Sequence, residues 1–322
     1  MENFSLFASV ADDLAAVEEK LKAYTCSSLE IMNRASLQLI EAGGKRLRPA
    51  FTLLTAKMYK EDLRDVIPLA AALEMIHMAT LVHDDVIDNS LTRRGQATVK
   101  NIWGNRFSIY LGNHMFARSL SIIAGYNRGD LLEVLADASM KICEGEIIQM
   151  FGWYNLNLGM KNYLQRIQRK TAVLLSVSCA LGAMLCDISE GQIVLHKKFG
   201  YYLGMAYQVI DDILDFVADE KILGKPSGSD IRQGVITLPA IYALRRGENK
   251  EELACWLSSP EKCRERVNDI IGAVLDSGGI DYAYGVARAF CERAMRQLDK
   301  MPPGAPKEEF MKITEFVINR NF

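Results

Sequence analysis

Apolar residues recur at steps of three and four positions through most of the 322-residue chain, a spacing that places them on one face of a helix. Runs of alternating β-branched residues bounded by turn dipeptides are nearly absent, so we expect almost no strand. The pattern therefore predicts an all-α fold. The predicted helices cover residues 10–23, 29–40, 49–58, 68–88, 107–124, 131–150, 163–186, 194–216, 237–244, 251–256, 263–277, 282–301 and 307–318.

The stretch 68–88 is apolar with almost no interruption, and we expect it to be buried on most sides. Two polar segments, 89–96 and 220–234, are predicted to be loops. No low-complexity linker or fixed-period repeat divides the chain. We therefore predict one domain, residues 1–322, a bundle of long helices around a central active-site cavity.

Two of these apolar helices carry clusters of three carboxylates at positions i, i+1 and i+4. Like charges at that spacing repel each other on a helix, so such a cluster needs a cation nearby. A solvated acidic helix end is the alternative for one cluster alone, but two clusters flanked by apolar residues argue against it. The clusters are Asp84, Asp85 and Asp88, and Asp211, Asp212 and Asp215.

The donor atoms in both clusters are all carboxylate oxygens, which suit a hard ion, and the spacing offers no thiolate or His pair for zinc. Mg²⁺ keeps several waters and is bound by one or two carboxylates together with substrate phosphates. We therefore predict Mg²⁺, three ions with the substrate bound, around a diphosphate that serves as a leaving group.

Basic residues occur where these acidic clusters need counterparts. Lys45 and Arg48 follow a Gly-Gly pair at a predicted helix start and share a face, which makes a good anion site. A solvated basic turn is the alternative for this stretch. Arg93 and Arg94 come just after the first cluster, and Arg binds diphosphate in a bidentate manner without a metal.

Further polar residues sit in otherwise apolar helices or in the loop after the second cluster. His77 lies two turns before Asp84 and shares its face, although a hydrogen-bonded core histidine is an equal alternative. The assembled pattern predicts transfer chemistry on two diphosphates, one metal-bound and leaving, the other held by cations on the acceptor. The remaining candidates are Lys170, Thr171, Gln208 and Lys225.

Composition narrows the class of protein further. Hydrophobic residues make up 49% and charged residues 24%, which fits a globular protein with a large core. The net charge of −2 gives no reason to expect nucleic acid as a partner. The seven cysteines form no C-x-x-C pair, and we see neither a membrane span nor a signal peptide. We expect a cytoplasmic protein with reduced cysteines.

With these residues assembled, the sequence resembles the all-trans polyprenyl diphosphate synthase family over nearly its whole length. The motifs Gly43-Gly-Lys45-Arg-Leu-Arg48-Pro49 and Arg93-Arg94-Gly95, the two Asp-Asp-x-x-Asp motifs and the segment 224–230 carry the resemblance. It implies an isoprenoid-synthase bundle, commonly dimeric, that joins isopentenyl diphosphate to an allylic diphosphate such as farnesyl diphosphate.

The resemblance also assigns roles to single residues. Both aspartate motifs are implied to bind Mg²⁺ and the allylic diphosphate, and Lys170 is counted with them as catalytic. The residues implied to bind isopentenyl diphosphate are Lys45, Arg48, His77 and Arg94. The residues implied to surround the allylic substrate are Arg93, Lys170, Thr171, Gln208 and Lys225.

Two positions depart from the common family pattern. Asn113 follows Gly112 where members often have Asp, and Val235 stands where many single-component members have Lys. Both changes resemble the larger, catalytic component of bacterial two-component synthases, which make hexaprenyl or heptaprenyl diphosphate for menaquinone. The active form is then either a homodimer or a heterodimer with a small helical subunit, and the product is passed to a membrane.

Product length is predicted from the helix before Asp84, because a growing tail descends past its side chains. Small residues at Ala79 and Thr80 leave the upper cavity open, and the floor is expected near Ile76 or Leu73. We expect hexaprenyl to octaprenyl products. A short-chain synthase is the alternative; a terpene cyclase would not need Lys45 and Arg48, and a non-catalytic partner subunit would have lost an aspartate motif.

Overall fold

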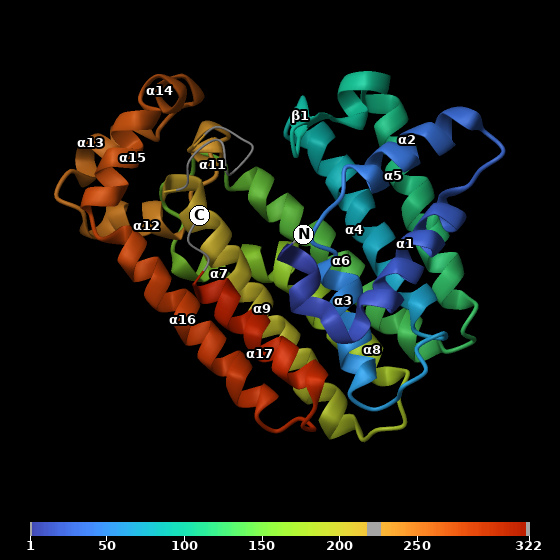
Figure 1. Cartoon of the computed structure of the whole chain (residues 1–322). Coiled ribbons are helices and arrows are strands. Elements are labelled where there is room, and N and C mark those ends of the chain that lie inside the picture. Colours follow the sequence, from blue (N-terminus) through green and yellow to red (C-terminus); the bar gives the residue numbers. More distant parts are fainter. Residues whose placement is uncertain (1, 218–226, 320–322) are drawn as a thin grey trace. The chain divides into compact units, whose positions relative to one another are not determined.

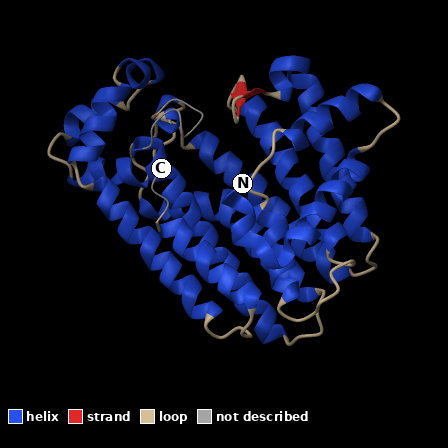
Figure 2. Ribbon diagram, in the orientation of Figure 1, coloured by secondary structure: helices blue, strands red, loops and turns tan. Residues whose placement is uncertain are grey.

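The computed structural model of the chain describes residues 2–217 and 227–319. Helices make up almost all of it, which confirms the predicted all-α class (Figure 2). The elements are η1 (Glu2–Val10), α1 (Ala11–Thr25), α2 (Glu30–Glu41), α3 (Leu47–Lys57), α4 (Ile67–Ile87), β1 (Thr92–Arg93), β2 (Gln96–Ala97), α5 (Val99–Ala124), α6 (Gly129–Phe151), α7 (Met160–Ile167), η2 (Gln168–Ala172), α8 (Val173–Met184), α9 (Glu190–Val217), α11 (Ser229–Arg232), α12 (Leu238–Arg246), α13 (Lys250–Trp256), α14 (Pro260–Glu265), α15 (Val267–Asp276), α16 (Gly279–Leu298) and α17 (Ala305–Ile318).

The chain forms two compact units, each assembled from separate stretches of sequence. The first contains Met1–Asp137, Leu175–Gly200 and Gln297–Lys312. The second contains Ala138–Leu174, Tyr201–Arg296 and Ile313–Phe322. The first aspartate motif belongs to the first unit and the second motif to the second unit. A single domain over residues 1–322 stays a prediction.

The core of the first unit is built on α4 and on an aromatic cluster. Leu73, Met75 and Ile76 on α4 have no exposed surface, as the uninterrupted apolar stretch predicts. Rings of Phe199 and Phe310 lie 4.7 Å apart in an edge-on arrangement. Phe51 on α3 completes the cluster, with its ring 5.3 Å from that of Phe310. The buried helix α4 carries the first aspartate motif at its C-terminal end.

A buried histidine gives this unit a predicted dependence on acid. His196 is fully buried beside Tyr59, whose hydroxyl lies 2.8 Å from His196 Nε2, and burial lowers the pKa of His196 to about 4. The unfolded chain therefore binds a proton between pH 6.5 and 4 that the folded chain does not. Stability is then complete above pH 6.5 and falls by roughly 3 kcal/mol as the pH drops to 4.

Urea unfolding at pH 7 and pH 4.5 measures this loss. We expect His196→Gln to flatten the pH dependence, whereas the exposed His114 replaced by Gln leaves it as in the wild-type chain. A His196→Gln variant with the wild-type slope would contradict the assignment.

Most helix ends fall within a few residues of the prediction, but α5 begins eight residues earlier than expected. Its start is set by Thr98, whose hydroxyl accepts a hydrogen bond from the Asn101 backbone N–H at 3.1 Å. Gly104 inside the helix has φ 83°, a non-helical conformation that interrupts the regular helical backbone. The predicted helix 107–124 is the part beyond this interruption.

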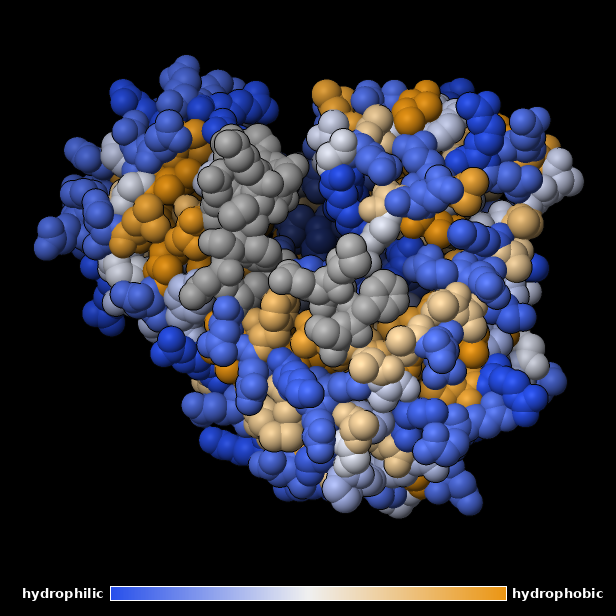
Figure 3. Space-filling model, in the orientation of Figure 1, coloured by the Kyte–Doolittle hydropathy of each residue, from blue (hydrophilic) through white to orange (hydrophobic). Residues whose placement is uncertain are grey.

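Short helices are grouped in the second unit, where α12, α13, α14 and α15 contact one another (Figure 1). Hydrophilic residues cover most of the face drawn in Figure 3, with apolar residues in separate patches. Among the helices of residues 2–217 and 227–319, none combines the length and the apolar character needed to cross a membrane.

Candidate active site

The first aspartate motif lies at the C-terminal end of α4. Asp84 and Asp85 are in the last turn and Asp88 is the C-cap residue. Backbone carbonyls at a helix C-terminus already carry partial negative charge, so three carboxylates there are unfavourable without cations. Asp85 is buried and accepts hydrogen bonds from Nε and Nη2 of Arg93 on one oxygen, both at 2.8 Å. Burial raises the pKa of Asp85, and the charges of Arg93 and Lys100 oppose that rise.

A short hairpin brings Arg93 to this position. The segment 89–96 was predicted as a loop, but β1 and β2 pair as antiparallel strands within it. Arg94 and Gly95 form the two-residue turn with φ of 52° and 74°, the signs of a type I′ turn. The strands are only two residues long and the turn lacks the usual Asn-Gly signal, which is why the sequence pattern missed them.

The Gly-Gly-Lys-Arg segment forms the turn between α2 and α3. Gly43 has φ 71°, and a Cβ built on Gly44 would lie 2.7 Å from Nη1 of Arg94. Glycine at position 44 therefore allows the Arg94 guanidinium to lie directly against the turn. Lys45 is in the turn and Arg48 in the first turn of α3, and both side chains are half-buried.

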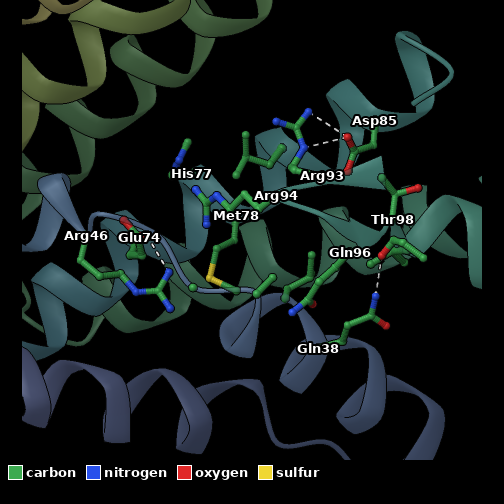
Figure 4. A pocket seen from close by; sticks show the side chains of 16 residues that line it. Gln38, Arg46, Glu74, His77, Met78, Asp85, Arg93, Arg94, Gln96 and Thr98 are labelled. Atoms are coloured by element: carbon green, nitrogen blue, oxygen red, sulfur yellow. Dashed lines mark hydrogen bonds and ion pairs between the residues drawn. The ribbon is translucent and has the colours of Figure 1, made fainter. Parts of the chain in front are cut away.

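One cavity of the first unit collects several of these predicted residues (Figure 4). His77, Asp85, Arg93 and Arg94 line it, together with Gly43. The cavity brings cationic groups to the first aspartate motif, as the sequence predicts. The lining also includes three residues to which the sequence analysis assigns no role: Gln38, Arg46 and Glu74.

His77 lines this cavity, and its role as a substrate-binding residue stays a prediction. Burial lowers its pKa well below 6.5, and the positive charges of Arg48, Arg94 and Arg93 lower it further. The imidazole is neutral at pH 7 and can donate one hydrogen bond to a phosphate oxygen without adding charge. Lys45 and Arg48 are not among the residues that line this cavity.

The four predicted chain-length residues lie elsewhere on α4. Leu73, Ile76 and Ala79 are buried, and the Thr80 hydroxyl donates a hydrogen bond to the His77 carbonyl at 2.8 Å. None of these four lines the cavity just described, whose α4 residues include Met78 and Leu81. A tail tunnel past Ala79 stays a prediction.

The second aspartate motif lies near the C-terminal end of α9, in the second unit. Asp211 is exposed, whereas Asp212 and Asp215 are buried. Asp212 accepts hydrogen bonds from the Tyr163 hydroxyl at 2.7 Å and from Gln208 Nε2 at 2.8 Å. Gln208 Oε1 in turn accepts from the Thr171 hydroxyl at 2.7 Å. The predicted pair Thr171 and Gln208 thus belongs to one hydrogen-bonded chain ending on the motif.

Asp215 anchors the segment that follows the motif. Its Oδ2 accepts a hydrogen bond from the Asp230 backbone N–H at 3.0 Å, and its carbonyl accepts from Gly228 N–H at 2.8 Å. Burial and then the nearby charge of Asp230 raise the pKa of Asp212 to about 7. The predicted residue Lys225 lies outside the described residues.

Lys170 and Thr171 lie in a single turn of π-helix, η2, between α7 and α8. The sequence predicted one continuous helix over 163–186, and this interruption is the main correction to the predicted fold. Neighbouring helices pack closely against this turn. A Cβ on Gly145 would lie 2.9 Å from the backbone nitrogen of Lys170, and a Cβ on Gly204 would lie 2.8 Å from Ala172 Cα. Lys170 Nζ pairs with Glu146 Oε2 at 2.6 Å.

The residues of both motifs fit a hard divalent cation. Their donors are carboxylate oxygens, and the raised pKa values of Asp85 and Asp212 mark negative charge that burial disfavours and a cation would relieve. Within the part of the chain that the structure describes, no three or more carboxyl, His or Cys side chains are placed to hold an ion alone. Mg²⁺ takes further ligands from water and substrate phosphates in addition to one or two carboxylates.

The helical fold and the two aspartate motifs at helix ends are typical of the class of helical enzymes that bind diphosphates through Asp-rich helix ends. The Polyprenyl synthetase family profile matches residues 29–274, and the chain belongs to this family. It is accordingly a trans-prenyltransferase, and the family depends on Mg²⁺.

Relatives and solved structures of this family match nearly the whole length of the chain. It is 39% identical to heptaprenyl diphosphate synthase component 2 of Geobacillus stearothermophilus, with 99% of each protein covered. The component 2 of Bacillus subtilis is 38% identical, with 98% of this chain and 90% of the relative covered. The crystal structure of heptaprenyl diphosphate synthase from Staphylococcus aureus matches with a TM-score of 0.91 at 34% identity, covering 97% of this chain and 98% of that one.

Proposed function

We propose that this chain condenses isopentenyl diphosphate with an allylic diphosphate such as farnesyl diphosphate to make hexaprenyl to octaprenyl diphosphate. The observation that carries the proposal is the cavity beside the first aspartate motif, where His77, Arg93 and Arg94 share one wall. His77 as a neutral donor and the Arg94 guanidinium are suited to the acceptor diphosphate without a metal, and Arg93 faces the first aspartate motif. The names of the heptaprenyl relatives support the product range.

The acceptor is assigned to the first unit and the allylic substrate to both aspartate motifs. We propose that Mg²⁺ is bound by the motifs, three ions with the allylic diphosphate present. All six carboxylates of the two motifs are assigned to the metal ions. Asp85, Asp212 and Asp215 also accept hydrogen bonds, from Arg93, Gln208 and the Asp230 backbone N–H, which hold these carboxylates in place.

The reaction follows from these assignments. Bound Mg²⁺ would supply electrostatic stabilisation of the departing diphosphate. Arg93, Lys170 and Lys225 are assigned to the allylic diphosphate, where their positive charge would favour breaking of the allylic C–O bond as its electron pair leaves with the diphosphate. The double bond of isopentenyl diphosphate forms the new C–C bond, and the adduct loses a proton. An apolar tunnel excludes water from the allylic cation.

Replacing Lys45 or Arg48 by Ala should separate the two substrates. Because we assign both cations to the acceptor diphosphate, we expect the KM for isopentenyl diphosphate to rise by roughly tenfold to a hundredfold, with a much smaller change for the allylic substrate. Steady-state kinetics with each substrate varied in turn measures this. Equal effects on both KM values would mean that the two anion sites are assigned wrongly.

Activity is proposed to depend on a second protein. Asn113 is exposed on α5, and Val235 is buried with its N–H donated to the Asp230 carbonyl at 2.8 Å. These two departures, with relatives named as one component of a synthase, support a heterodimer with a small helical subunit over a homodimer. We further propose a cytoplasmic enzyme whose product passes to a membrane for quinone side-chain synthesis.

The test is turnover of isopentenyl diphosphate and farnesyl diphosphate with Mg²⁺ by the purified chain, alone and with the small helical subunit from the same source. We expect weak turnover alone and recovery on addition of the subunit, with EDTA abolishing both. Absence of turnover in every arm would refute the synthase assignment. Full processive elongation by the chain alone would refute the need for a partner.

A further inference from the structure

Arg46, the middle cation of the Gly-Gly-Lys-Arg-Leu-Arg segment, has an unusual backbone. It is the N-cap residue of α3 with φ 48° and ψ 37°, the left-handed conformation that residues other than glycine rarely adopt. Such a conformation persists only where surrounding contacts enforce it. Its side chain is 12% exposed, although arginine is a surface residue in most proteins.

Every nitrogen of the Arg46 guanidinium has an acceptor. Nε donates to Glu18 on α1, and Nη2 donates to the same carboxylate at 3.2 Å. Nη1 donates to Glu74 Oε1 on α4 at 3.1 Å (Figure 4). Nη2 also donates to the Ile40 carbonyl in α2 at 2.9 Å. One side chain therefore joins the start of α3 to α1, α2 and α4.

This bonding leaves Arg46 little capacity to bind substrate. Two carboxylates face one guanidinium, so its charge is more than neutralised, and four of its five N–H donors already have an acceptor. Lys45 and Arg48, which flank Arg46 in the segment, are the cations that the proposed function assigns to the acceptor diphosphate. Glu74 stands three residues before His77 on α4 and lines the same cavity. The network thus fixes the turn directly against the helix that carries His77 and the first aspartate motif.

We propose that Arg46, through Glu18 and Glu74, is a positioning residue that holds the turn 43–46 so that Lys45 and Arg48 are set for the acceptor diphosphate. The inference rests on the proposed function and adds to it a residue that touches no substrate. A mispositioned turn weakens binding of isopentenyl diphosphate and leaves binding of the allylic diphosphate unchanged.

Arg46→Met tests this by removing all the hydrogen bonds while keeping an unbranched side chain. We expect the KM for isopentenyl diphosphate to rise by roughly tenfold or more, with kcat and the KM for farnesyl diphosphate within about threefold. Calorimetric binding of isopentenyl diphosphate to the enzyme without allylic substrate should weaken by the same factor. Backbone amides of residues 43–48 should exchange hydrogen faster. The matched control is Arg64→Met, since Arg64 pairs only with Asp62 in the described part of the chain and is 89% exposed.

Arg46→Lys examines the geometry, because an ammonium keeps the charge but cannot bridge three partners with a planar fork. It should recover little of the lost affinity. Glu18→Gln, at a more exposed position, covers the case in which Arg46→Met does not fold and should raise the same KM by a smaller factor. Unchanged exchange at residues 43–48 in a folded variant, equal effects on both substrates, or full recovery with Lys would overturn the proposal. A wild-type chain without turnover would instead refute the proposed function, and the exchange comparison would still test the anchor.

Discussion

Replacing Asp84 or Asp211 by Ala should lower turnover by three or more orders of magnitude and leave the fold intact. Each removes a proposed Mg²⁺ ligand from one motif, and several kcal/mol of transition-state stabilisation depend on the metal. Since about 1.36 kcal/mol corresponds to a tenfold change in rate, a loss of roughly 4 kcal/mol gives a thousandfold reduction. Asp84 is half-buried at a helix C-terminus and Asp211 is exposed, so neither supports the core.

Turnover at saturating Mg²⁺ and the midpoint of urea unfolding are measured for each variant. Removal of one carboxylate from a repelling cluster should leave stability equal or slightly raised. Asp187→Ala is the matched control, because Asp187 is exposed in the turn between α8 and α9. Near-normal turnover by either motif variant at saturating Mg²⁺ would contradict the assignment of these aspartates as metal ligands.

Ala79→Tyr should shorten the product to farnesyl or geranylgeranyl length while turnover continues. Ala79 lies five residues before Asp84 on α4 and is 1% exposed. If a tail runs past this position, the phenol ring fills the tunnel and stops elongation. If the position is close-packed, the ring overpacks the core at a cost of about 1–3 kcal/mol and the product keeps its length.

Product sizing and unfolding measurements on the same variant separate these two outcomes. Thr80→Phe is a second variant at a half-buried position, where a ring is easier to accommodate. Ala79→Ser is the control that keeps the volume small. A folded Ala79→Tyr enzyme that still makes the wild-type length would show that the tail does not pass Ala79.

Helical periodicity was enough to predict the fold class and most element boundaries. The clearest success is α4, predicted over 68–88 and observed as Ile67–Ile87, because its apolar residues and its proline start are both local signals. The π turn at Lys170 was missed because an extra residue in one turn barely disturbs a pattern of steps of three and four. Gly145 and Gly204, which allow neighbouring helices to approach that turn, are the signal that was present.

The chemistry of the site was predicted from residue types, whereas its supporting contacts were not. Arg93 was expected near the first motif from its closeness in sequence, and the structure pairs it with Asp85. Arg46 and Glu74 are 28 residues apart, and nothing local in either segment indicates that they meet. Tyr163 donates to Asp212 across 49 positions in the same way. Such pairs depend on tertiary packing, which periodicity does not encode.

The central claim is that this chain elongates an allylic diphosphate to a long polyprenyl chain. The most direct measurement is the length of the products formed from farnesyl diphosphate and labelled isopentenyl diphosphate with Mg²⁺, with and without the small helical subunit. We expect hexaprenyl to octaprenyl diphosphate, formed in greater amount when the subunit is present. Products that end at farnesyl or geranylgeranyl length in both mixtures, or no incorporation of label in either, would contradict it.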